Sequence, residues 1–342
     1  MLLRQLKTKN RGVTIEPMEE IMNRVLIFVS ALVLTGAALA QQASYPNRPL
    51  RIIIPWPPGQ ATDLAGRVVA QQISGILGQQ VIPDNRPGAG GMIGTDLAAK
   101  STADGYTLLA ASSGPVTINP LLQKVPFDPV RDLSPVANVG LSPYILVTGT
   151  KFPASNVKEF IALVKANPGK YNFASSGTGA TAHLVAEIFN GRAGLQVTHV
   201  PYKGSAPAMV DVISGEVAYA LETMAATLPH IRSGRLKAYG ISLAKGSALA
   251  PDIEPLATGA NLPGFDVGAW IGVMVPSGTP KPLIERLAAA IEKAMKASET
   301  VDRIHAAGLE VDYRRGSEFG RFLGEQRTRF ADIIKKNNIH ID

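Results

Sequence analysis

The chain has 342 residues, enough for two domains with a sizeable core, and it contains no cysteine. The absence of cysteine excludes disulfides, thiolate metal sites and cysteine nucleophiles. The net charge of +7 is distributed along the chain without a clustered basic block, so the sequence predicts no nucleic-acid partner.

The N-terminal region resembles a secretory leader. Arg24 precedes an uncharged apolar run over residues 25–39, which ends in an A-x-A cleavage motif. We therefore predict cleavage after Ala40 and a periplasmic location. Residues 1–21 include glutamates that do not suit the basic region of a signal, so we expect translation to start at Met22. An uncleaved membrane anchor is the alternative, disfavoured because the run is shorter than a typical span.

The first unit after the leader is predicted to be a strand, a rigid loop and a helix. Residues 51–54 form a β-branched apolar run that suits a buried parallel strand, and the prolines that follow prevent further pairing. Thr62 or Asp63 is expected to cap a helix over residues 64–79, whose apolar positions keep helical spacing. The free N–H groups at that helix start suit an anion, although such turns also occur with nothing bound.

Small and hydroxyl-bearing residues follow the next two predicted strands. The glycine spacing over residues 88–94 does not match a dinucleotide fingerprint, and we expect these glycines to allow close approach to a ligand or to the first loop. Ser112 and Ser113 follow a strand over residues 106–111. Because ligands in open α/β sheets lie at the carboxyl ends of strands, these loops are candidate contacts.

A second α/β pattern begins after strands at residues 136–140 and 144–147. Asn156 and Glu159 form a capping box before a helix. A later strand leads into the hydroxyl-rich loop of residues 175–181, which opens another helix. Two donor-rich loops, one in each half of the chain, would hold a molecule with a carboxylate at each end.

The C-terminal part is expected to return to the first domain. Two strand-like runs within residues 264–275 precede two long amphipathic helices over residues 282–296 and 317–336.

Catalysis is poorly supported by the sequence. Ser175 or Ser176 with His183 is the one pair that suggests a serine hydrolase, but no nucleophile elbow surrounds either serine. The histidines show no recognised metal spacing. We therefore predict no enzyme activity, no catalytic residue, no metal and no cofactor, with the hydrolase kept as a less favoured alternative.

A series of motifs runs in order along the chain and carries a family resemblance. These motifs lie at residues 45–49, 55–59 with Asp63, 85–91 with Gly94, 104–108, 128–133, 201–204, Trp270 with Gly272, and 276–280. On these residues the chain resembles the Bug proteins, the periplasmic substrate-binding components of tripartite tricarboxylate transporters.

The resemblance implies a two-domain α/β periplasmic binding protein, type II-like, with the ligand cleft between the domains. Each domain is expected to be a mixed, mostly parallel sheet flanked by helices. The expected boundaries are residues 41–144 with 266–342 for domain 1 and residues 145–265 for domain 2.

The resemblance also implies a small carboxylate ligand (a dicarboxylate, a tricarboxylate or an aromatic acid, and in some members an amino acid or a nicotinate-like acid), permease subunits of the transporter as partners, and a monomer. An extracytoplasmic sensor is the alternative function. The expected ligand contacts, from the loops above and from the family motifs together, are Trp56, Gly59, Gln60, Ala61, Thr62, Asp63, Ser112, Ser113, Ser175, Ser176, Thr178, Gly179, Thr181, Lys203, Gly204 and Glu222.

Three positions depart from the family pattern. Gln60 stands where a second glycine is usual, so its side chain could reach into the cleft. Glu222 stands where Asp is frequent, and could pair with a ligand ammonium or cap a helix. The family's Pro-Thr-x-x-Glu segment is altered at residues 254–258.

Overall fold

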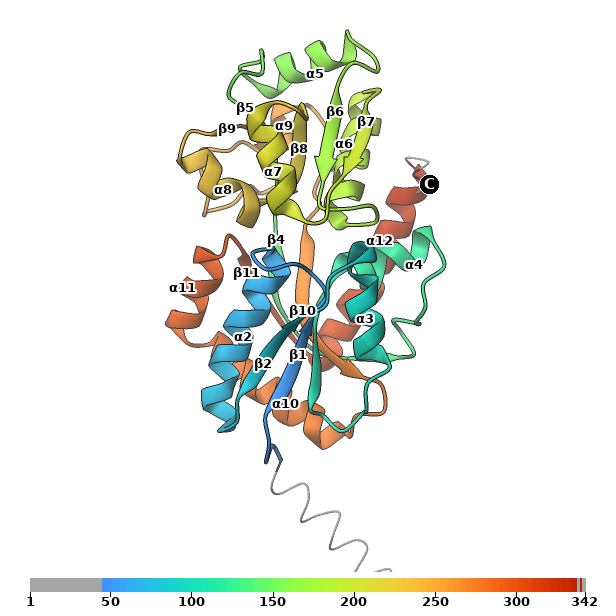
Figure 1. The fold of residues 1–342 in the computed structure, drawn as a ribbon, viewed down its shortest axis with the longest axis vertical. Helices are drawn as coiled ribbons and strands as arrows, with labels where there is room; N and C mark the ends of the chain where they lie inside the picture. Colours follow the sequence, from blue (N-terminus) through green and yellow to red (C-terminus); the bar gives the residue numbers. More distant parts are fainter. Residues whose placement is uncertain (1–44, 337–338, 340–342) are drawn as a thin grey trace, which may run out of the picture. The chain divides into compact units, whose positions relative to one another are not determined.

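The computed structural model describes residues 45–336 and residue 339, and the described residues from Pro46 onward belong to one compact unit (Figure 1). The predicted signal sequence, the start at Met22 and the cleavage point after Ala40 lie outside the described residues. Within the described part of the chain, no helix has the length and apolarity needed to cross a membrane.

The first sheet has six strands in the order β11-β4-β10-β3-β1-β2. Strands β1, β2 and β3 pair in parallel, whereas β10 returns antiparallel between β3 and β4. The β-branched run of β1 is almost wholly buried, as expected for a central parallel strand. The strands are β1 (Leu50–Ile54), β2 (Val81–Asn85), β3 (Thr107–Ser112), β4 (Leu133–Ser142), β10 (Ala269–Pro276) and β11 (Glu310–Arg315).

Helices cover this sheet, and we call the sheet with its helices lobe 1. A Cβ on Gly66 in α2 would lie 3.1 Å from Ala110, so this glycine permits close packing of α2 on the sheet. Helix α10 packs beside α2. The elements are α2 (Ala61–Leu77), η1 (Ala89–Gly91), α3 (Met92–Ala99), η2 (Gly114–Ile118), α4 (Asn119–Leu122), α10 (Lys281–Met295), α11 (Ser298–Ala306) and α12 (Gly316–Lys336).

The second sheet has five strands in the order β7-β6-β8-β5-β9, and we call it, with its helices, lobe 2. Its core is aromatic: Phe160 packs edge-on against Tyr219, with ring centroids 5.0 Å apart. Asn156 caps α5 by accepting from the Glu159 N–H at 2.9 Å, which confirms the predicted cap. The elements are β5 (Tyr144–Gly149), α5 (Val157–Lys165), β6 (Asn172–Ser175), α6 (Thr181–Ala193), β7 (Thr198–Pro201), α7 (Ser205–Ser214), β8 (Tyr219–Thr223), α8 (Met224–Arg232), β9 (Leu236–Ile241) and α9 (Leu256–Gly259).

The two mixed sheets flanked by helices confirm the predicted fold class. Parallel pairs are fewer than expected, because β5 and β10 each run antiparallel to both neighbours. Lobe 1 takes β1–β4, β10 and β11, and lobe 2 takes β5–β9. We propose that the predicted domains correspond to these lobes.

The C-terminal region differs from its prediction in three places. A single strand, β10, replaces the two strand-like runs expected within residues 264–275. Helix α11 and strand β11 were not predicted. The sequence of β11 is strongly charged and its residues are only partly buried, because it is an edge strand and needs no apolar face.

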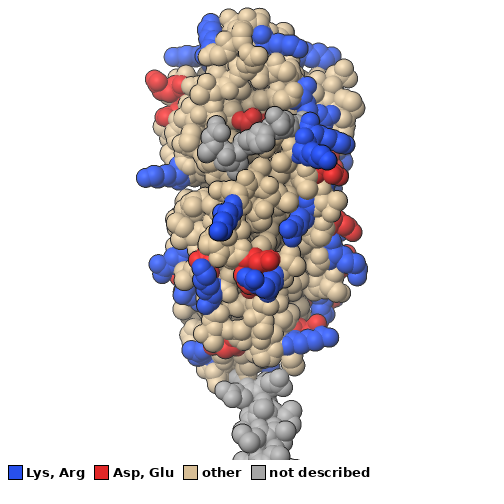
Figure 2. All heavy atoms as spheres, turned by 90° about the vertical axis from the view of Figure 1, so that its right-hand side faces the viewer, with Lys and Arg blue, Asp and Glu red and all other residues tan. Residues whose placement is uncertain are grey.

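Basic side chains are spread over the surface seen in Figure 2. Lys and Arg occur from one end of that face to the other, with Asp and Glu between many of them. This face therefore carries charge of both signs and no single continuous basic patch.

Candidate functional site

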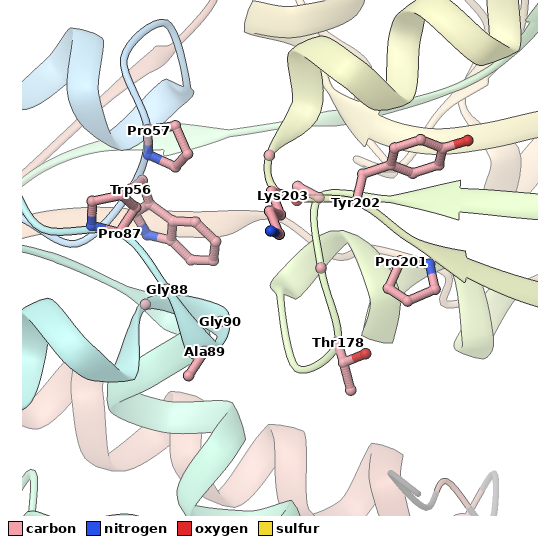
Figure 3. A pocket seen from close by; sticks show the side chains of 14 residues that line it. Trp56, Pro57, Pro87, Gly88, Ala89, Gly90, Thr178, Pro201, Tyr202 and Lys203 are labelled. Carbon is pink, nitrogen blue, oxygen red and sulfur yellow. The ribbon is translucent and has the colours of Figure 1, made fainter.

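Two hollows lie between the lobes, and Trp56 and Ser176 line both of them. The outer groove has a volume of about 460 Å³ and is lined by Trp56, Pro57, residues 87–91, residues 176–178 and residues 201–204. Figure 3 shows Trp56, Pro57 and the glycine turn (residues 88–90) on one side of this groove, and Thr178, Tyr202 and Lys203 on the other.

The inner chamber is much smaller, about 30 Å³, and polar side chains are mixed with apolar ones in its lining. Its lining residues are Trp56, Gln60, Ala61, Thr62, Ser112, Ser142, Tyr144, Ser176, Thr181, Ala182, Glu222, Thr223, Ala269 and Ile271. The first turns of both α2 and α6 contribute to this wall, so two helix N-termini meet at one chamber.

The loop between β1 and α2 forms the first wall, and we call it jaw 1 (residues 55–63). Helix α2 begins at Ala61 with Gln60 as its N-cap, and no side chain caps it. The prediction that Thr62 or Asp63 is the N-cap is therefore wrong, because both lie inside the first turn.

Asp63 fixes jaw 1 from within the helix. Its side chain is only 2% exposed. One carboxylate oxygen accepts from the Gly59 N–H at 2.9 Å, and the other accepts from Arg67 Nε and Asn85 Nδ2, both at 2.8 Å. Gly59 has a φ of 85°, a backbone conformation that favours glycine. Asp63 therefore ties the loop, the helix and the end of β2 together.

Trp56 separates the two hollows. Its Nε1 donates to Ser112 Oγ at 2.9 Å, and its carbonyl accepts from Asn85 Nδ2 at 2.9 Å. A Cβ on Gly91 would lie 3.2 Å from the indole ring. The glycine turn thus approaches the first loop closely, as its sequence predicted.

The loop between β6 and α6 forms the opposite wall, and we call it jaw 2 (residues 175–181). Ser175 Oγ lies 2.7 Å from His199 Nε2 and accepts from the Gly177 N–H at 3.2 Å. The Gly179 N–H donates to His183 Nδ1 at 3.4 Å. The rings of His183 and His199 stack with centroids 3.9 Å apart, behind the loop.

His199, in this stacked pair, is held neutral by its surroundings. Burial, and then the neighbouring His183, lower the pKa of His199 to about 3. An imidazole of that pKa is a weak base, and Ser175 is fully buried and lines neither hollow. The serine found beside a histidine therefore supports the loop and is poorly placed to attack a substrate.

Lobe 1 and lobe 2 touch across the cleft, through residues in and beside the two jaws. Ser113 Oγ and Thr181 Oγ1 lie 3.0 Å apart, and Gln60 Nε2 donates to Ser205 Oγ at 3.2 Å. A Cβ on Gly90 would lie 2.9 Å from the Thr178 carbonyl oxygen, so only a glycine fits there. The lobes are therefore in contact along much of the cleft.

Glu222 is the second-last residue of β8, lines the inner chamber and is fully buried. Its Oε1 accepts from the Thr223 N–H at 2.8 Å. Burial raises the pKa of this carboxyl, against the lowering effect of the Thr223 N–H and of the Ser176 and Ser205 hydroxyls nearby.

The predicted contact residues fall into four groups. Lys203, Gly204 and Thr178 line the outer groove, Gln60, Ala61, Thr62, Ser112, Thr181 and Glu222 line the inner chamber, and Trp56 and Ser176 line both. The remaining five line neither hollow: Gly59, Asp63, Ser113, Ser175 and Gly179.

Some lining residues were not among the predicted contacts. Ser142 and Tyr144 reach the inner chamber from the strands that connect the lobes, where a sequence shows only buried strand residues. Pro201 and Tyr202 were within a family motif, and that motif was the signal that could have placed them.

Two lobes built on mixed sheets, with helix N-termini facing a chamber between them, define the class of bilobal periplasmic solute-binding proteins. The family model described as "Tripartite tricarboxylate transporter family receptor" matches residues 65–339, and the chain belongs to this family. The predicted resemblance is thus confirmed.

Three relatives illustrate the similarity. Protein BugT of Bordetella pertussis is 38% identical over 319 residues, which cover 92% of this chain and 98% of that protein. An R. palustris protein solved with adipate is 26% identical with a TM-score of 0.82, covering 86% of this chain and 99% of that one. MatC from Rhodopseudomonas palustris, solved with bound malate, is 29% identical with a TM-score of 0.80, covering 85% and 100%. The family and these neighbours are solute-binding proteins, which confirms the prediction that the chain is not an enzyme.

Proposed function

We propose that this protein captures a small organic carboxylate between its lobes in the periplasm and delivers it to the membrane permease of a tripartite tricarboxylate transporter. The observation that carries the proposal is the meeting of two helix N-termini, those of α2 and α6, at one chamber whose lining includes several hydroxyl groups. The malate and adipate in related structures support the same ligand class.

In this mechanism, uncharged hydrogen-bond donors bind the ligand carboxylate. The first-turn N–H groups of α2 and α6 and the hydroxyls of Thr62, Ser176 and Thr181 line or adjoin the chamber. Helix N-termini favour negative charge, and neutral donors lose less on desolvation than a fixed cation would. Closure of the lobes brings the two donor sets onto one ligand, and the Ser113–Thr181 contact belongs to that closed arrangement.

A thermal-shift and calorimetry screen tests the ligand class. The leaderless protein is unfolded, dialysed and refolded to remove bound ligand, then mixed with malate, succinate, adipate, citrate and benzoate. We expect at least one of these acids to raise the midpoint of thermal unfolding in proportion to its concentration over its Kd. A folded, ligand-free protein that responds to none of them would overturn the proposal.

A matched pair of variants tests whether the responding acid binds in the inner chamber. Thr181→Val removes a chamber hydroxyl at the start of α6, whereas Thr328→Val removes an exposed hydroxyl on α12. We expect the first to weaken binding of the responding acid about 5- to 15-fold, the loss of one hydrogen bond, and the second to leave it unchanged. Equal effects would place the ligand elsewhere.

Delivery has a separate test. Uptake of the responding acid by cells that contain the cognate permease should require this protein, and size-exclusion chromatography should show the proposed monomer. Uptake that persists without the protein would leave binding intact but remove the transport role.

A further inference from the structure

Glu222 presents a buried oxygen to the inner chamber. Its Oε1 is engaged by the Thr223 N–H, but its Oε2 has no hydrogen-bond partner among the described residues. The Ser176 and Ser205 hydroxyls lie near enough to influence the carboxyl, yet neither makes a hydrogen bond of ordinary geometry to Oε2. A fully buried, unpartnered carboxyl oxygen is costly, so its position at a ligand chamber requires an explanation.

The chamber offers no cation to this carboxyl. Hydroxyl, amide and apolar groups make up its lining, and no Lys, Arg or His is among these described residues. Lys203 lines the outer groove and not the chamber. A plain dicarboxylate would therefore bring further negative charge to a site that already holds an uncompensated carboxyl, and like charges at close range disfavour joint ionisation.

We propose that Glu222 is a specificity-determining residue that pairs with a cationic nitrogen of the ligand, so that this chain prefers an organic acid that also bears an ammonium group. This inference rests on the proposed function, because the carboxylate of the same ligand is assigned to the donors of the helix N-termini.

The arrangement of donors and acceptors fits such a ligand at both ends. Thr181, in the first turn of α6, lines the same chamber as Glu222, so a carboxylate on the helix N-terminus and an ammonium on Glu222 can belong to one small molecule. The ammonium neutralises Glu222, and the helix N-terminus stabilises the carboxylate. The chamber volume of about 30 Å³ has room for about two water-sized polar groups, and the ligand body can extend past Trp56 and Ser176 into the outer groove.

Matched ligand pairs test the inference directly. Calorimetry on the refolded, ligand-free protein would compare succinate with aspartate and glutarate with glutamate, which differ by one amino group. We expect the wild-type protein to bind the amino member of at least one pair at least 10-fold more tightly. Glu222→Gln, which removes the charge at nearly constant volume, should abolish that preference, and Glu222→Asp should retain part of it.

The outcomes separate this inference from the proposed function. If no acid of either kind binds, the proposed function fails. If plain acids bind and the amino members gain nothing, only the role of Glu222 fails. The role of Glu222 also fails, and the proposed function stands, if the plain acids bind with uptake of a proton. That uptake would be seen as a binding heat that depends on the buffer, and it would mean that a protonated Glu222 donates a hydrogen bond to a ligand carboxylate. Should Glu222→Gln not fold, the wild-type pairs and Glu222→Asp still decide the question.

Discussion

Jaw 1 and jaw 2 hold similar loops by different chemistry. Jaw 1 is fixed by the carboxylate of Asp63, which joins Gly59, Arg67 and Asn85. Jaw 2 is fixed by a serine and two stacked histidines, all buried or partly buried behind the loop. The difference teaches that a donor-rich loop can be supported by a carboxylate or by a stacked pair of imidazoles.

The largest effect is expected from breaking the support of jaw 1. Asp63→Ala leaves the Gly59 N–H without its acceptor and removes one of the two acceptors of the Asn85 amide, so we expect a loss of about 2–4 kcal/mol in unfolding free energy and loss of ligand binding. Urea unfolding and calorimetry measure both. Arg67→Ala is the control, because that arginine is 45% exposed and should contribute less than about 1 kcal/mol. Similar losses in both variants would mean that the ion pair, not the loop contacts, holds the jaw.

The next largest effect on stability is expected at Glu222, in the inner chamber. Burial raises the pKa of this carboxyl above its ordinary value of 4.5. At a pH between 4.5 and the raised pKa of the folded state, Glu222 holds a proton in the folded protein that it has lost in the unfolded protein. The free energy of unfolding should therefore fall as the pH rises through that window. We expect Glu222→Gln, without ligand, to be about 1–3 kcal/mol more stable than wild type at neutral pH, and equally stable at pH 4.

Urea unfolding of both proteins from pH 4 to pH 8 measures this difference. A constant difference across that range would show that titration of Glu222 is not the cause.

A smaller effect is expected where lobe 1 meets jaw 2. Ser113→Ala removes the contact with Thr181 across the cleft and leaves both jaw supports in place. We expect ligand affinity to fall by about 0.5–1.5 kcal/mol with little change in the stability of the ligand-free protein. Small-angle scattering with and without the responding acid would show whether closure is reduced. An unchanged affinity would show that this contact does not contribute to the closed state.

The smallest effect on stability at neutral pH is expected at His199, one of the two histidines that support jaw 2. Because the pKa of His199 is lowered to about 3 from its ordinary value near 6.5, the unfolded state takes up a proton first as the pH falls. The stability due to this group is therefore complete above pH 6.5 and is lost progressively towards pH 3. We expect His199→Gln to reduce the acid sensitivity of unfolding while changing little at pH 8. His305→Gln, on α11 outside the jaws, is the control. The same acid profile in both variants would contradict the role of His199.

Local sequence was sufficient for the parts of the fold that local physics controls. The buried run of β1, the apolar spacing of α2 and α10 and the cap at Asn156 are read from neighbouring residues, and they were found where expected. The charged edge strand β11 was missed, because its stability comes from pairing with β4 and not from an apolar pattern of its own.

The candidate site shows the same division. The donor-rich loops at residues 59–63 and 175–181 were predicted because small and hydroxyl residues before a helix carry a local signal. The neighbours of those loops were not predictable, because they come from distant parts of the chain. Ser175 meets His199 because β6 and β7 pair in parallel, and Gln60 meets Ser205 across the cleft.

The sequence by itself therefore determined most of the strands and helices, which loops carry donors and which family the motifs resemble. Only the tertiary structure decided that Glu222 lies uncompensated in a chamber, that Asp63 braces a loop in place of capping a helix, and that two histidines support the opposite jaw. The physical reason is that periodicity and capping depend on residues a few positions apart, whereas burial, charge compensation and contact across a cleft depend on which distant segments fold together.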